Sequence, residues 1–438
     1  MDNQPTTRRA SLLTHGCRLN QTETNLIREQ LESRGFEVVP FGEEAELGII
    51  NTCTVTREAE AKCRQSIRGF IRKNPEAFTA VIGCYSQMGA NEIAGIKGVD
   101  LIVGNHDKMA VLDYADQGKL ERPLILRDRI QGDEFTMSFA GELPSTQRAN
   151  LKVQDGCDFM CSFCIIPFAR GRARPRALGN LLEEAKQLAE SGVKELVITG
   201  VNIGTYALDK AGQSITILEV VDALNAIPGI ERIRISSIEP TTIPSGLIDR
   251  MAAPDHSVLP YLHIPLQSGT DTILEIMRRR YRIAEFLDFI NDAATRVPNL
   301  CIGTDIMVGH PGETEELFEE TCRVFLESPL HYCHVFPYSE RPGTLATKRT
   351  DHVPMKERKR RSARLRRLSE MKRHDFYSSY LGKQRPVLWE HSPEPNIWTG
   401  LTDNYIRVIT RNESNLLNTI TQAEIVNLMA DVAEAHVL

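Results

Sequence analysis

Short apolar runs alternate with amphipathic stretches along the first third of the chain. The apolar runs LGIINTC, AVIGCYS and VDLIVGN cover residues 47–53, 80–86 and 99–105, and the amphipathic stretches cover residues 22–34 and 58–73. Such alternation of strand and helix patterns predicts a parallel sheet flanked by helices. The loops at the carboxyl ends of parallel strands gather at one edge of the sheet, so Cys53 and Cys84 are expected at that edge.

The same alternation returns between Leu151 and about residue 350. Its strand candidates are residues 195–200, 230–237, 260–266, 301–309 and 331–339, and its helix candidates are 180–191, 216–227, 270–280 and 314–327. Repeated strand–helix units of this length predict a (β/α) barrel or a large part of one. Residues 107–148, between the two regions, are polar and irregular and are interpreted as a connector.

The last part of the chain has a different pattern. A basic, helix-compatible segment covers residues 354–374, and short β-rich runs such as RPVLWEH and NYIRVIT follow it. These runs predict a small all-β barrel. The whole chain is therefore predicted to be an α/β multidomain protein. Its parts would be an N-terminal Rossmann-like parallel α/β domain (1–140), a central partial (β/α) barrel (146–374) and a C-terminal small all-β barrel (375–438).

Composition narrows the class of protein. Among the 438 residues no run of about 18 apolar residues occurs, and the first residues lack the apolar core of a secretory signal, so a cytoplasmic protein is expected. The net charge of −6 means that any RNA binding must use a local basic surface. Ten cysteines in a long cytoplasmic chain favour metal binding or catalysis over disulfide bonds.

Three cysteines form a tight group near the start of the barrel region. Cys157, Cys161 and Cys164 have the spacing C-x3-C-x2-C in DGCDFMCSFC. Three thiolates on one loop suit one face of a [4Fe–4S] cluster, and the missing fourth cysteine leaves one iron open to chelate a substrate. The alternatives are a zinc knuckle or three core cysteines, but no histidine lies between Asn150 and Gly200 to complete a zinc site.

This cysteine loop resembles that of radical S-adenosylmethionine (SAM) enzymes. The resemblance implies that the open iron binds the amino and carboxylate groups of SAM, which is then cleaved to a 5′-deoxyadenosyl radical. Phe163, just before the last cysteine, matches the aromatic position that packs near the adenine. In such enzymes the cofactor carries out the difficult chemistry, while the protein orients it and excludes water.

Three further cysteines lie in the N-terminal region, in THGCRLNQ (Cys17), NTCTVT (Cys53) and VIGCYSQ (Cys84). Each alone would be read as an ordinary buried cysteine. Together with C-x3-C-x2-C, the motifs G-C-x-x-N, N-T-C and G-C-Y resemble the methylthiotransferase family over the whole chain, with a C-terminal TRAM domain. The resemblance implies a second [4Fe–4S] cluster on these three cysteines that carries sulfur, with SAM also serving as methyl donor. The remaining cysteines, Cys63, Cys301, Cys322 and Cys333, match no motif and are expected to be packing residues.

Polar residues follow several predicted barrel strands, where a site would form. The cofactor-binding candidates are Gly200 and Asn202 in TGVNIGTY, Ser236, Ser237 and Glu239 in RISSIEP, Gln267 in HIPLQSG, beside His263 and Ser268, and Asp305 in TDIMVGHPGE. Turn formation or capping is the alternative for each of them. Arg170, Arg172 and Arg174 closely follow the cysteine loop and are candidates to contact RNA phosphate or the SAM carboxylate, the alternative being a solvated basic loop.

The sequence G-C-R-L-N-Q-T-E around Cys17 resembles the branch of the family that modifies N6-threonylcarbamoyladenosine in tRNA. That branch adds the methylthio group to C2 of the purine next to the anticodon, which implies a reducing electron donor and a sulfur source as further partners. The alternatives are the branches that modify N6-isopentenyladenosine in tRNA or an aspartate of a ribosomal protein. The predicted TRAM domain has more acidic than basic residues, which favours a basic protein, whereas the adjoining basic segment 356–373 favours RNA. A monomer is expected.

Overall fold

The computed structural model describes residues 8–132, 134–137, 147–210 and 213–438, which form two compact units. The first unit combines the N-terminal part of the chain with residues 154–180 and 339–347. The second combines a short stretch before Gln154 with residues 181–338 and 348–438. All six cysteines of the two predicted sets therefore belong to the first unit, and the predicted barrel residues from Gly200 to Asp305 belong to the second.

The first unit is built on a parallel sheet of six strands in the order β2-β1-β3-β4-β5-β6. The strands are β1 (Arg9–Thr14), β2 (Glu37–Val39), β3 (Leu47–Thr52), β4 (Phe78–Gly83), β5 (Leu101–Val103) and β6 (Leu124–Leu126). The helices are α1 (Arg18–Ser33), α2 (Arg57–Lys73), α3 (Cys84–Ala94), α4 (Ile166–Arg170) and the 3-10 helix η1 (Lys108–Gln117), and a short ladder pairs β8 (Gln154–Asp155) with β9 (Arg174–Pro175). The predicted connector is thus wrong in part, because η1 and β6 both lie within residues 107–148.

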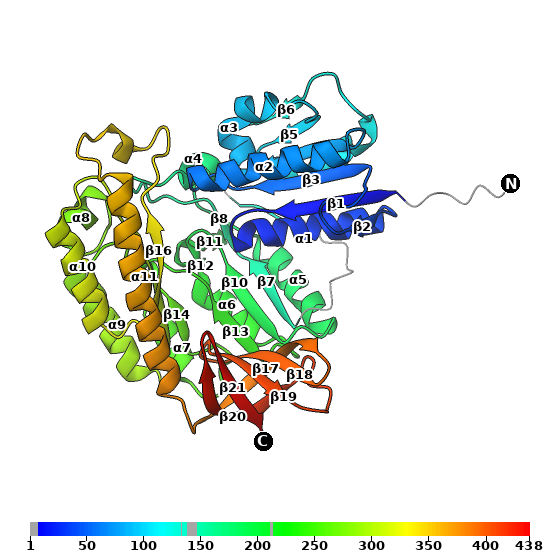
Figure 1. Ribbon diagram of the computed structural model, residues 1–438. Coiled ribbons are helices and arrows are strands. Elements are labelled where there is room, and N and C mark those ends of the chain that lie inside the picture. The colour runs from blue at the N-terminus through cyan, green and yellow to red at the C-terminus, as the bar shows by residue number, and fades with distance from the viewer. Residues whose placement is uncertain (1–7, 133, 138–146, 211–212) are drawn as a thin grey trace. The chain divides into compact units, whose positions relative to one another are not determined.

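Both faces of this sheet are apolar, as strands covered on two sides require. One face packs against α1 and η1 through residues such as Ile27 and Leu112, and the other packs against α2 and α3 through Ile67 and Ile93 (Figure 1). Every residue of β3 and β4 is buried. Accessible polar groups are therefore expected in the loops that follow these strands, where a functional site can form.

The second unit contains two three-stranded parallel sheets, β7-β10-β13 and β14-β15-β16, which are joined by a bridge between Ser237 and His263. The strands are β7 (Arg148–Lys152), β10 (Glu195–Thr199), β13 (Arg232–Ile235), β14 (Tyr261–His263), β15 (Cys301–Val308) and β16 (Tyr332–Pro337), with a hairpin of β11 (Ala207–Lys210) and β12 (Gln213–Thr216). The α-helices are α5 (Leu178–Glu190), α6 (Ile217–Asn225), α7 (Gly246–Ala252), α8 (Asp271–Ile276), α9 (Ile283–Arg296), α10 (Glu315–Glu327) and α11 (Met355–Ser378). The 3-10 turns are η2 (Ile203–Thr205), η3 (Pro240–Thr242) and η4 (Leu345–Lys348). The first residues of α5 and most of η4 belong to the first unit. This arrangement confirms the predicted partial (β/α) barrel.

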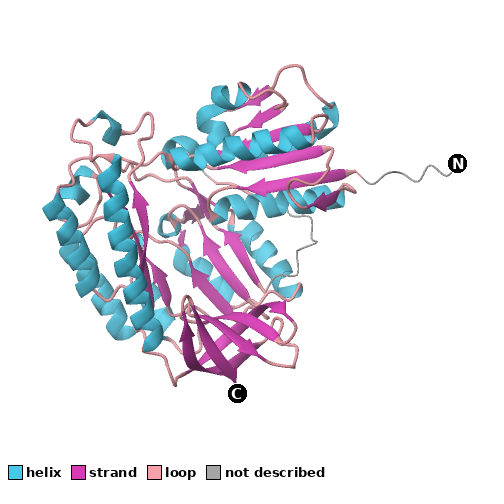
Figure 2. Cartoon of the chain, in the orientation of Figure 1, coloured by secondary structure: helices cyan, strands magenta, loops and turns pink. Residues whose placement is uncertain are grey.

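The last strands close into a barrel in the order β17-β18-β19-β21-β20 (Figure 2). They are β17 (Gln384–Glu394), β18 (Ile397–Thr402), β19 (Arg407–Arg411), β20 (Ile420–Met429) and β21 (Val432–Val437). The barrel core includes Trp389, which is fully buried and donates its indole N–H to Thr421 Oγ1 at 2.9 Å. The predicted small all-β barrel is confirmed. No helix in the described residues is long and apolar enough to cross a membrane.

Candidate functional site

The three N-terminal cysteines follow the ends of three neighbouring strands. Thr14 of β1 pairs with Asn51 of β3, and Thr52 of β3 pairs with Gly83 of β4. Cys17 follows β1 by three residues, while Cys53 and Cys84 directly follow β3 and β4. The parallel register therefore places all three thiols at one edge of the sheet.

Two glycines allow the backbone to approach closely beside these cysteines. Gly16 has a φ of +104°, and a Cβ there would lie 2.9 Å from Cys53 Cβ and 3.1 Å from its Sγ. Gly83 has a φ of +97°, and a Cβ there would lie 2.4 Å from Asn51 Oδ1. Any side chain at Gly16 would therefore be strained and would fill space beside the Cys53 thiol. This explains why glycine precedes cysteine in the first motif.

The asparagines of the same motifs tie the loops together. Asn20 Nδ2 donates to His15 O at 2.8 Å and to Thr52 O at 3.0 Å, so it joins the Cys17 loop to the Cys53 loop. Asn51 Nδ2 donates to Asn20 O at 3.0 Å. The first two motifs therefore each supply a thiol and also the amide that fixes the other's loop.

The thiols are close enough to affect one another. Burial raises the pKa of Cys53 to about 12, and Cys84, Cys17 and Cys63 add to this rise. Asn105 Nδ2 lies 3.4 Å from Cys84 Sγ. All ten cysteines are free thiols, and no three His, Cys, Asp or Glu side chains within the described ranges form the group that a single metal ion needs.

The C-x3-C-x2-C loop is shaped by tight backbone contacts. Gly156 has a φ of +74°, and a Cβ there would lie 1.9 Å from Arg172 O, so only glycine fits. Cys157 N donates to Gly171 O at 3.1 Å, and Cys164 N donates to Cys161 O at 3.1 Å. The loop is thus folded back on itself and presents its three cysteines from one short segment.

A buried ion network lies between the two sets of cysteines. The Arg170 side chain is 1 % exposed, and its Nη1 lies 3.1 Å from Glu23 and 2.9 Å from Asp155, while Nη2 donates to Asn20 Oδ1 at 2.5 Å. Lys108 also pairs with Glu23, at 2.5 Å. Burial would lower the pKa of Arg170, but Asp155, Cys84, Glu23 and Cys17 together raise it, so the guanidinium stays charged.

The three arginines after the cysteine loop have different surroundings. The Arg170 guanidinium is buried and already paired with Glu23 and Asp155. It is therefore suited to position the loops rather than to contact RNA phosphate. Arg174 is also buried, with Asp155 at 3.8 Å and the ring of Phe135 5.8 Å from its Cζ. The Arg172 side chain is 81 % exposed and pairs with Asp158 at 2.6 Å. Of the three, Arg172 alone is exposed.

In the second unit, the polar residues after β10 and β13 come together. Asn202 is buried; its Oδ1 accepts from Thr242 Oγ1 at 3.0 Å and from Glu239 N at 3.5 Å. The carboxylate of Glu239 is paired with Arg279. Ser236 N donates to Ile198 O at 3.1 Å, which joins the two strand ends. Gly200 directly follows β10 in the same loop as Asn202.

The residues after β14 form a second group with β15. Gln267 has a φ of +64°, its N donates to Asp305 O at 2.8 Å, and Asp305 Oδ1 lies 3.0 Å from His263 Nε2. Asp305 lies within β15 rather than after it, so its side chain projects from the sheet itself. Ser268 instead is buried against Thr270 and Thr321. The structure thus brings Gln267, Asp305 and His263 together and leaves Ser268 in the packing.

Sequence reasoning missed residues that reach the first unit from far along the chain. Arg341 is buried and pairs with Glu60, and its Nη2 donates to Thr54 Oγ1 at 3.2 Å, next to Cys53. Ala346 N donates to Ser162 O at 2.8 Å, inside the cysteine loop. The Pro342-Gly343 turn signal shows that a loop lies there, but nothing in the pattern indicates its partners.

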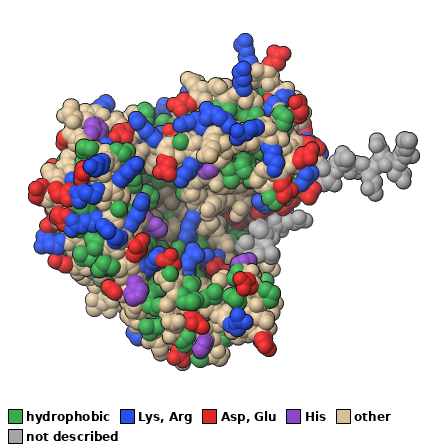
Figure 3. Space-filling model, viewed as in Figure 1, with side chains coloured by type: hydrophobic (Ala, Val, Ile, Leu, Met, Phe, Trp, Pro, Cys, Tyr) green, Lys and Arg blue, Asp and Glu red, His purple; other side chains and the backbone are tan. Residues whose placement is uncertain are grey.

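The predicted basic segment forms helix α11, and three of its arginines are paired with carboxylates on or just before α10. Arg361 pairs with Glu313 at 2.6 Å, Arg360 with Glu315 at 2.5 Å, and Arg364 with Glu319. Figure 3 shows Lys and Arg side chains interspersed with Asp and Glu over the face where α10 and α11 lie. These ion pairs dock α11 against α10, whereas other cations of the segment, such as Lys359 and Arg367, are exposed to solvent.

Comparisons with known proteins agree with this geometry. Residues 151–325 match the radical SAM superfamily, and residues 9–104 match a family described as uncharacterized protein family UPF0004. The fold is similar to a radical S-adenosylmethionine methyltransferase, TsrM, from Kitasatospora setae, with a TM-score of 0.51 and 14 % identity over 75 % of this chain and 73 % of that one. The chain thus has the fold of a radical SAM enzyme.

Sequence relatives define the family. The chain is 37 % identical to the threonylcarbamoyladenosine tRNA methylthiotransferase MtaB of Bacillus subtilis, over 94 % of this chain and 92 % of that protein. It is 36 % identical to the MtaB of Aquifex aeolicus, over 90 % and 95 %. A tRNA-2-methylthio-N(6)-dimethylallyladenosine synthase of Nitratidesulfovibrio vulgaris is 33 % identical over 86 % and 85 %. The chain therefore belongs to the radical SAM methylthiotransferase family, and it is an enzyme of that class.

The cofactors of this family are two [4Fe–4S] clusters and SAM. The residues present fit these groups. Thiolates are the usual ligands of such clusters, and each set of cysteines supplies three of them. Gly16 leaves free the space beside the Cys53 thiol that a side chain would fill, and Gly156 lets the C-x3-C-x2-C loop fold back against Arg172 O.

Replacing Arg170 by methionine is expected to destabilise the first unit by about 3–5 kcal/mol, because Glu23 and Asp155 would lose a buried counter-charge. Both cysteine loops would loosen, so iron incorporation should fall at both sets. Arg172→Met, two residues on, is the matched control, since its exposed ion pair contributes at most about 1 kcal/mol. Urea unfolding of the metal-free chain and iron content after reconstitution measure the two effects; equal behaviour of the two variants would contradict the role of the network.

Proposed function

We propose that this enzyme transfers a methylthio group to C2 of N6-threonylcarbamoyladenosine in tRNA, next to the anticodon. The observation that carries the proposal is the similarity to relatives with that named activity, at 36–37 % identity over at least 90 % of the chain. The motif G-C-R-L-N-Q-T-E around Cys17 supports the same branch.

In this proposal the two cysteine sets have separate tasks. Cys157, Cys161 and Cys164 hold the cluster whose open iron binds SAM, and Cys17, Cys53 and Cys84 hold the cluster that carries sulfur. When bound, the clusters and SAM supply the radical, the sulfur and the methyl group. The cofactor-binding residues proposed for SAM are Phe163, Gly200, Asn202, Ser236, Ser237, Glu239, Gln267 and Asp305.

The chain's own contribution is positioning. Asn20 and Asn51 fix the loops of the sulfur-carrying set, and Arg170 couples them to the C-x3-C-x2-C loop. His263 holds Asp305, and Arg279 holds Glu239. The two carboxylates among the residues proposed to bind SAM are therefore pre-oriented. We propose Arg172 as the contact to substrate phosphate, because its side chain is exposed. A one-electron reductant and a sulfur source complete the partners.

We keep the predicted division into an N-terminal domain (1–140), a radical SAM domain (146–374) and a TRAM domain (375–438) as part of the proposal. The closed barrel of β17–β21 supports the last of these. A second candidate substrate is N6-isopentenyladenosine in tRNA, because a dimethylallyladenosine relative is 33 % identical over 86 % of the chain.

The deciding experiment compares the substrates directly. The protein is reconstituted with iron and sulfide without oxygen, then incubated with SAM, dithionite and tRNA that carries either threonylcarbamoyladenosine or isopentenyladenosine. We expect the methylthio nucleoside, detected by mass spectrometry after digestion, only from the first tRNA. Product from the second tRNA alone would move the enzyme to the other branch. If 5′-deoxyadenosine forms while neither tRNA changes, the substrate assignment is wrong, and the ribosomal-protein aspartate becomes the next substrate to test.

A further inference from the structure

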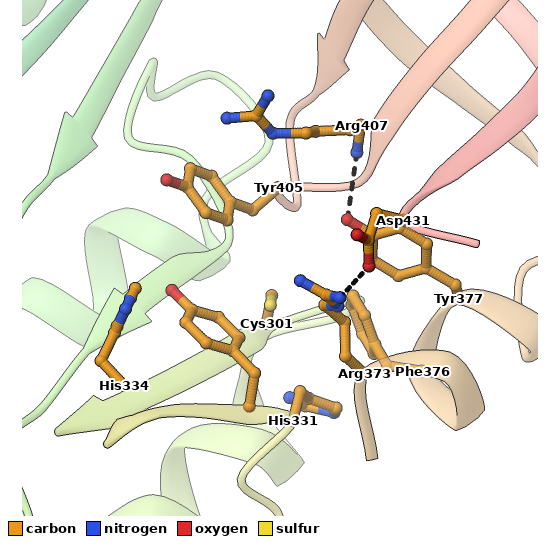
Figure 4. Close-up of a pocket in the computed structure, with 10 residues that line it drawn as sticks. Cys301, His331, His334, Arg373, Phe376, Tyr377, Tyr405, Arg407 and Asp431 are labelled. Atoms are coloured by element: carbon orange, nitrogen blue, oxygen red, sulfur yellow. Dashed lines mark hydrogen bonds and ion pairs between the residues drawn. The ribbon is translucent and has the colours of Figure 1, made fainter. Parts of the chain in front are cut away.

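A cavity of about 370 Å³ lies in the second unit, where the C-terminal barrel meets α11 and the starts of β15 and β16 (Figure 4). Its walls include Tyr332, Tyr405, Phe376, His331, Arg373 and Arg407. This volume falls within the range of pockets that bind small organic groups. None of these residues belongs to the cysteine loops or to the residues proposed for SAM.

Tyr405 enters this cavity from a strained turn. Its φ is +74°, a conformation that is rare for a bulky residue and often marks a functional site. The turn is closed by Tyr405 N donating to Thr402 O at 3.2 Å and by Ile406 N donating to Thr402 Oγ1 at 2.8 Å. Glycine or asparagine would adopt this backbone at lower cost, so the tyrosine ring itself is what the position supplies.

The rings in the cavity form a series of aromatic faces. The centroids of Tyr405 and Tyr332 are 6.3 Å apart with planes 17° from parallel, and the centroids of Tyr405 and Tyr261 are 4.3 Å apart. The Arg234 guanidinium lies 5.2 Å from the Tyr405 ring centroid. It also donates a hydrogen bond to Asp403 O, which fixes the turn that carries Tyr405. Rigid aromatic faces of this kind are platforms on which nucleobases stack.

The charges in the cavity suit a phosphate. Figure 4 shows the Arg407 side chain extending past Tyr405. Among the described residues, no ion pair is formed by Arg407, whose side chain is exposed. Arg373 faces the same space and pairs with Asp431. The barrel segment from Asp375 onward is acidic overall, so the concentration of arginine at this cavity departs from its surroundings.

A chain of side-chain contacts also links the cavity to residues of the partial (β/α) barrel. Tyr332 Oη lies 2.6 Å from Tyr261 Oη and 3.5 Å from His263 Nδ1, and His263 Nε2 lies 3.0 Å from Asp305. Cys301, at the cavity, is the first residue of β15, whereas Asp305 lies four residues on, about 13 Å along the strand. An occupant of the cavity would therefore be near the proposed SAM residues but separate from them.

From this combination we infer that the cavity binds one unpaired nucleotide of the RNA substrate, other than the nucleotide that is modified. Its base stacks on Tyr405 and Tyr332, and its phosphate binds Arg407. RNA loops are recognised mainly through unstacked bases held on aromatic side chains, and this cavity supplies such a platform beside a free cation. The inference rests on the proposed function in one respect, namely that the substrate is a tRNA.

The test measures binding of a fluorescent anticodon stem–loop RNA to the reconstituted full-length protein by anisotropy. Tyr405→Asn removes the ring and keeps a residue that tolerates positive φ, and it is expected to weaken binding about 5- to 150-fold. Arg407→Gln should weaken binding and lower the slope of log K against log salt by about 0.7–0.9, the effect of one lost phosphate contact. Tyr405→Asn should leave that slope unchanged.

Arg411→Gln is the matched control, because Arg411 is exposed on the same strand, outside the cavity, and the change in net charge is the same. It should bind RNA within about twofold of the wild type. Unchanged unfolding temperature and iron content show that each variant is folded. If the wild type binds RNA and Tyr405→Asn and Arg407→Gln bind equally well, the cavity inference is overturned while the proposed function stands. If the wild type binds a basic ribosomal-protein peptide and no RNA, both are overturned.

Discussion

Cys17→Ala is expected to leave the reductive cleavage of SAM nearly unchanged and to abolish methylthio transfer, whereas Cys157→Ala is expected to abolish both. The physical reason is that the two sets of cysteines are on separate loops, and only the C-x3-C-x2-C loop is assigned an open iron for SAM. Each variant should retain one cluster, so iron content should fall from about eight to about four atoms per chain. The measurement quantifies 5′-deoxyadenosine and the methylthio nucleoside in the same anaerobic reaction.

Cys63→Ala provides a demanding control for this prediction. Cys63 is fully buried on α2, its Sγ is 3.7 Å from Cys53 O, and its thiol is close enough to affect the pKa of Cys53. As a packing residue, its replacement should cost about 1 kcal/mol of stability and leave both the iron content and the product unchanged. Loss of half the iron in Cys63→Ala, with full iron in Cys17→Ala, would instead assign the second cluster to Cys53, Cys63 and Cys84.

The placement of Cys53 and Cys84 at one sheet edge could be predicted from the sequence for a physical reason, whereas grouping them with Cys17 as cluster ligands rested on the family resemblance. Strand ends are marked by short apolar runs that stop at a glycine or a polar residue, and parallel strands place such ends at one edge. Cys53 and Cys84 follow β3 and β4 directly, as the pattern predicted. The four cysteines outside the motifs, Cys63, Cys301, Cys322 and Cys333, are buried as expected of packing residues.

The sequence could not reveal ion pairs between residues that lie far apart along the chain. Arg170 was predicted as a substrate contact because it sits in a basic run, but its partners Glu23 and Asn20 are about 150 residues earlier in the chain. Two arginines of the basic α11 segment likewise have their acidic partners on α10, some 45 residues earlier in the chain, and only the fold reveals these pairs. Charge patterns along a chain show which residues need a partner, and only the tertiary fold shows which partner they have.

The buried carboxylate of Glu195 holds the arginines that link the C-terminal barrel to the partial (β/α) barrel. Its oxygens lie 2.6 Å from Arg234 Nε, 3.8 Å from Arg232 and 3.9 Å from Arg148. Arg234 and Arg232 in turn donate to the backbone oxygens of Thr402, Asp403, Leu401 and Pro386 in the C-terminal barrel. Burial alone would raise the pKa of Glu195, but Arg234, Arg148 and Arg232 lower it.

Glu195→Gln is therefore expected to destabilise the second unit by about 3–5 kcal/mol, because the buried guanidinium of Arg234 would lose its charged partner. The 401–405 turn that carries Tyr405 should exchange its amide hydrogens faster, since Arg232 and Arg234 hold it in place. Because the folded pKa of Glu195 is below its ordinary value of 4.5, its contribution is present above that pH and is lost as the pH falls through the lowered pKa. The difference between variant and wild type should accordingly stay constant between about pH 6 and pH 8.

Glu231→Gln supplies the comparison, because Glu231 lies next to β13 and makes an exposed ion pair with Lys194 at 2.7 Å. Its loss should cost no more than about 1 kcal/mol and should leave exchange in the 401–405 turn unchanged. Urea unfolding and hydrogen–deuterium exchange measured on both variants separate a buried counter-charge from a surface pair. Equal stability of the two variants, or wild-type exchange of the turn in Glu195→Gln, would contradict this role of Glu195. The hydrogen bonds from Arg232 and Arg234 to the barrel backbone would then hold the turn without their counter-charge.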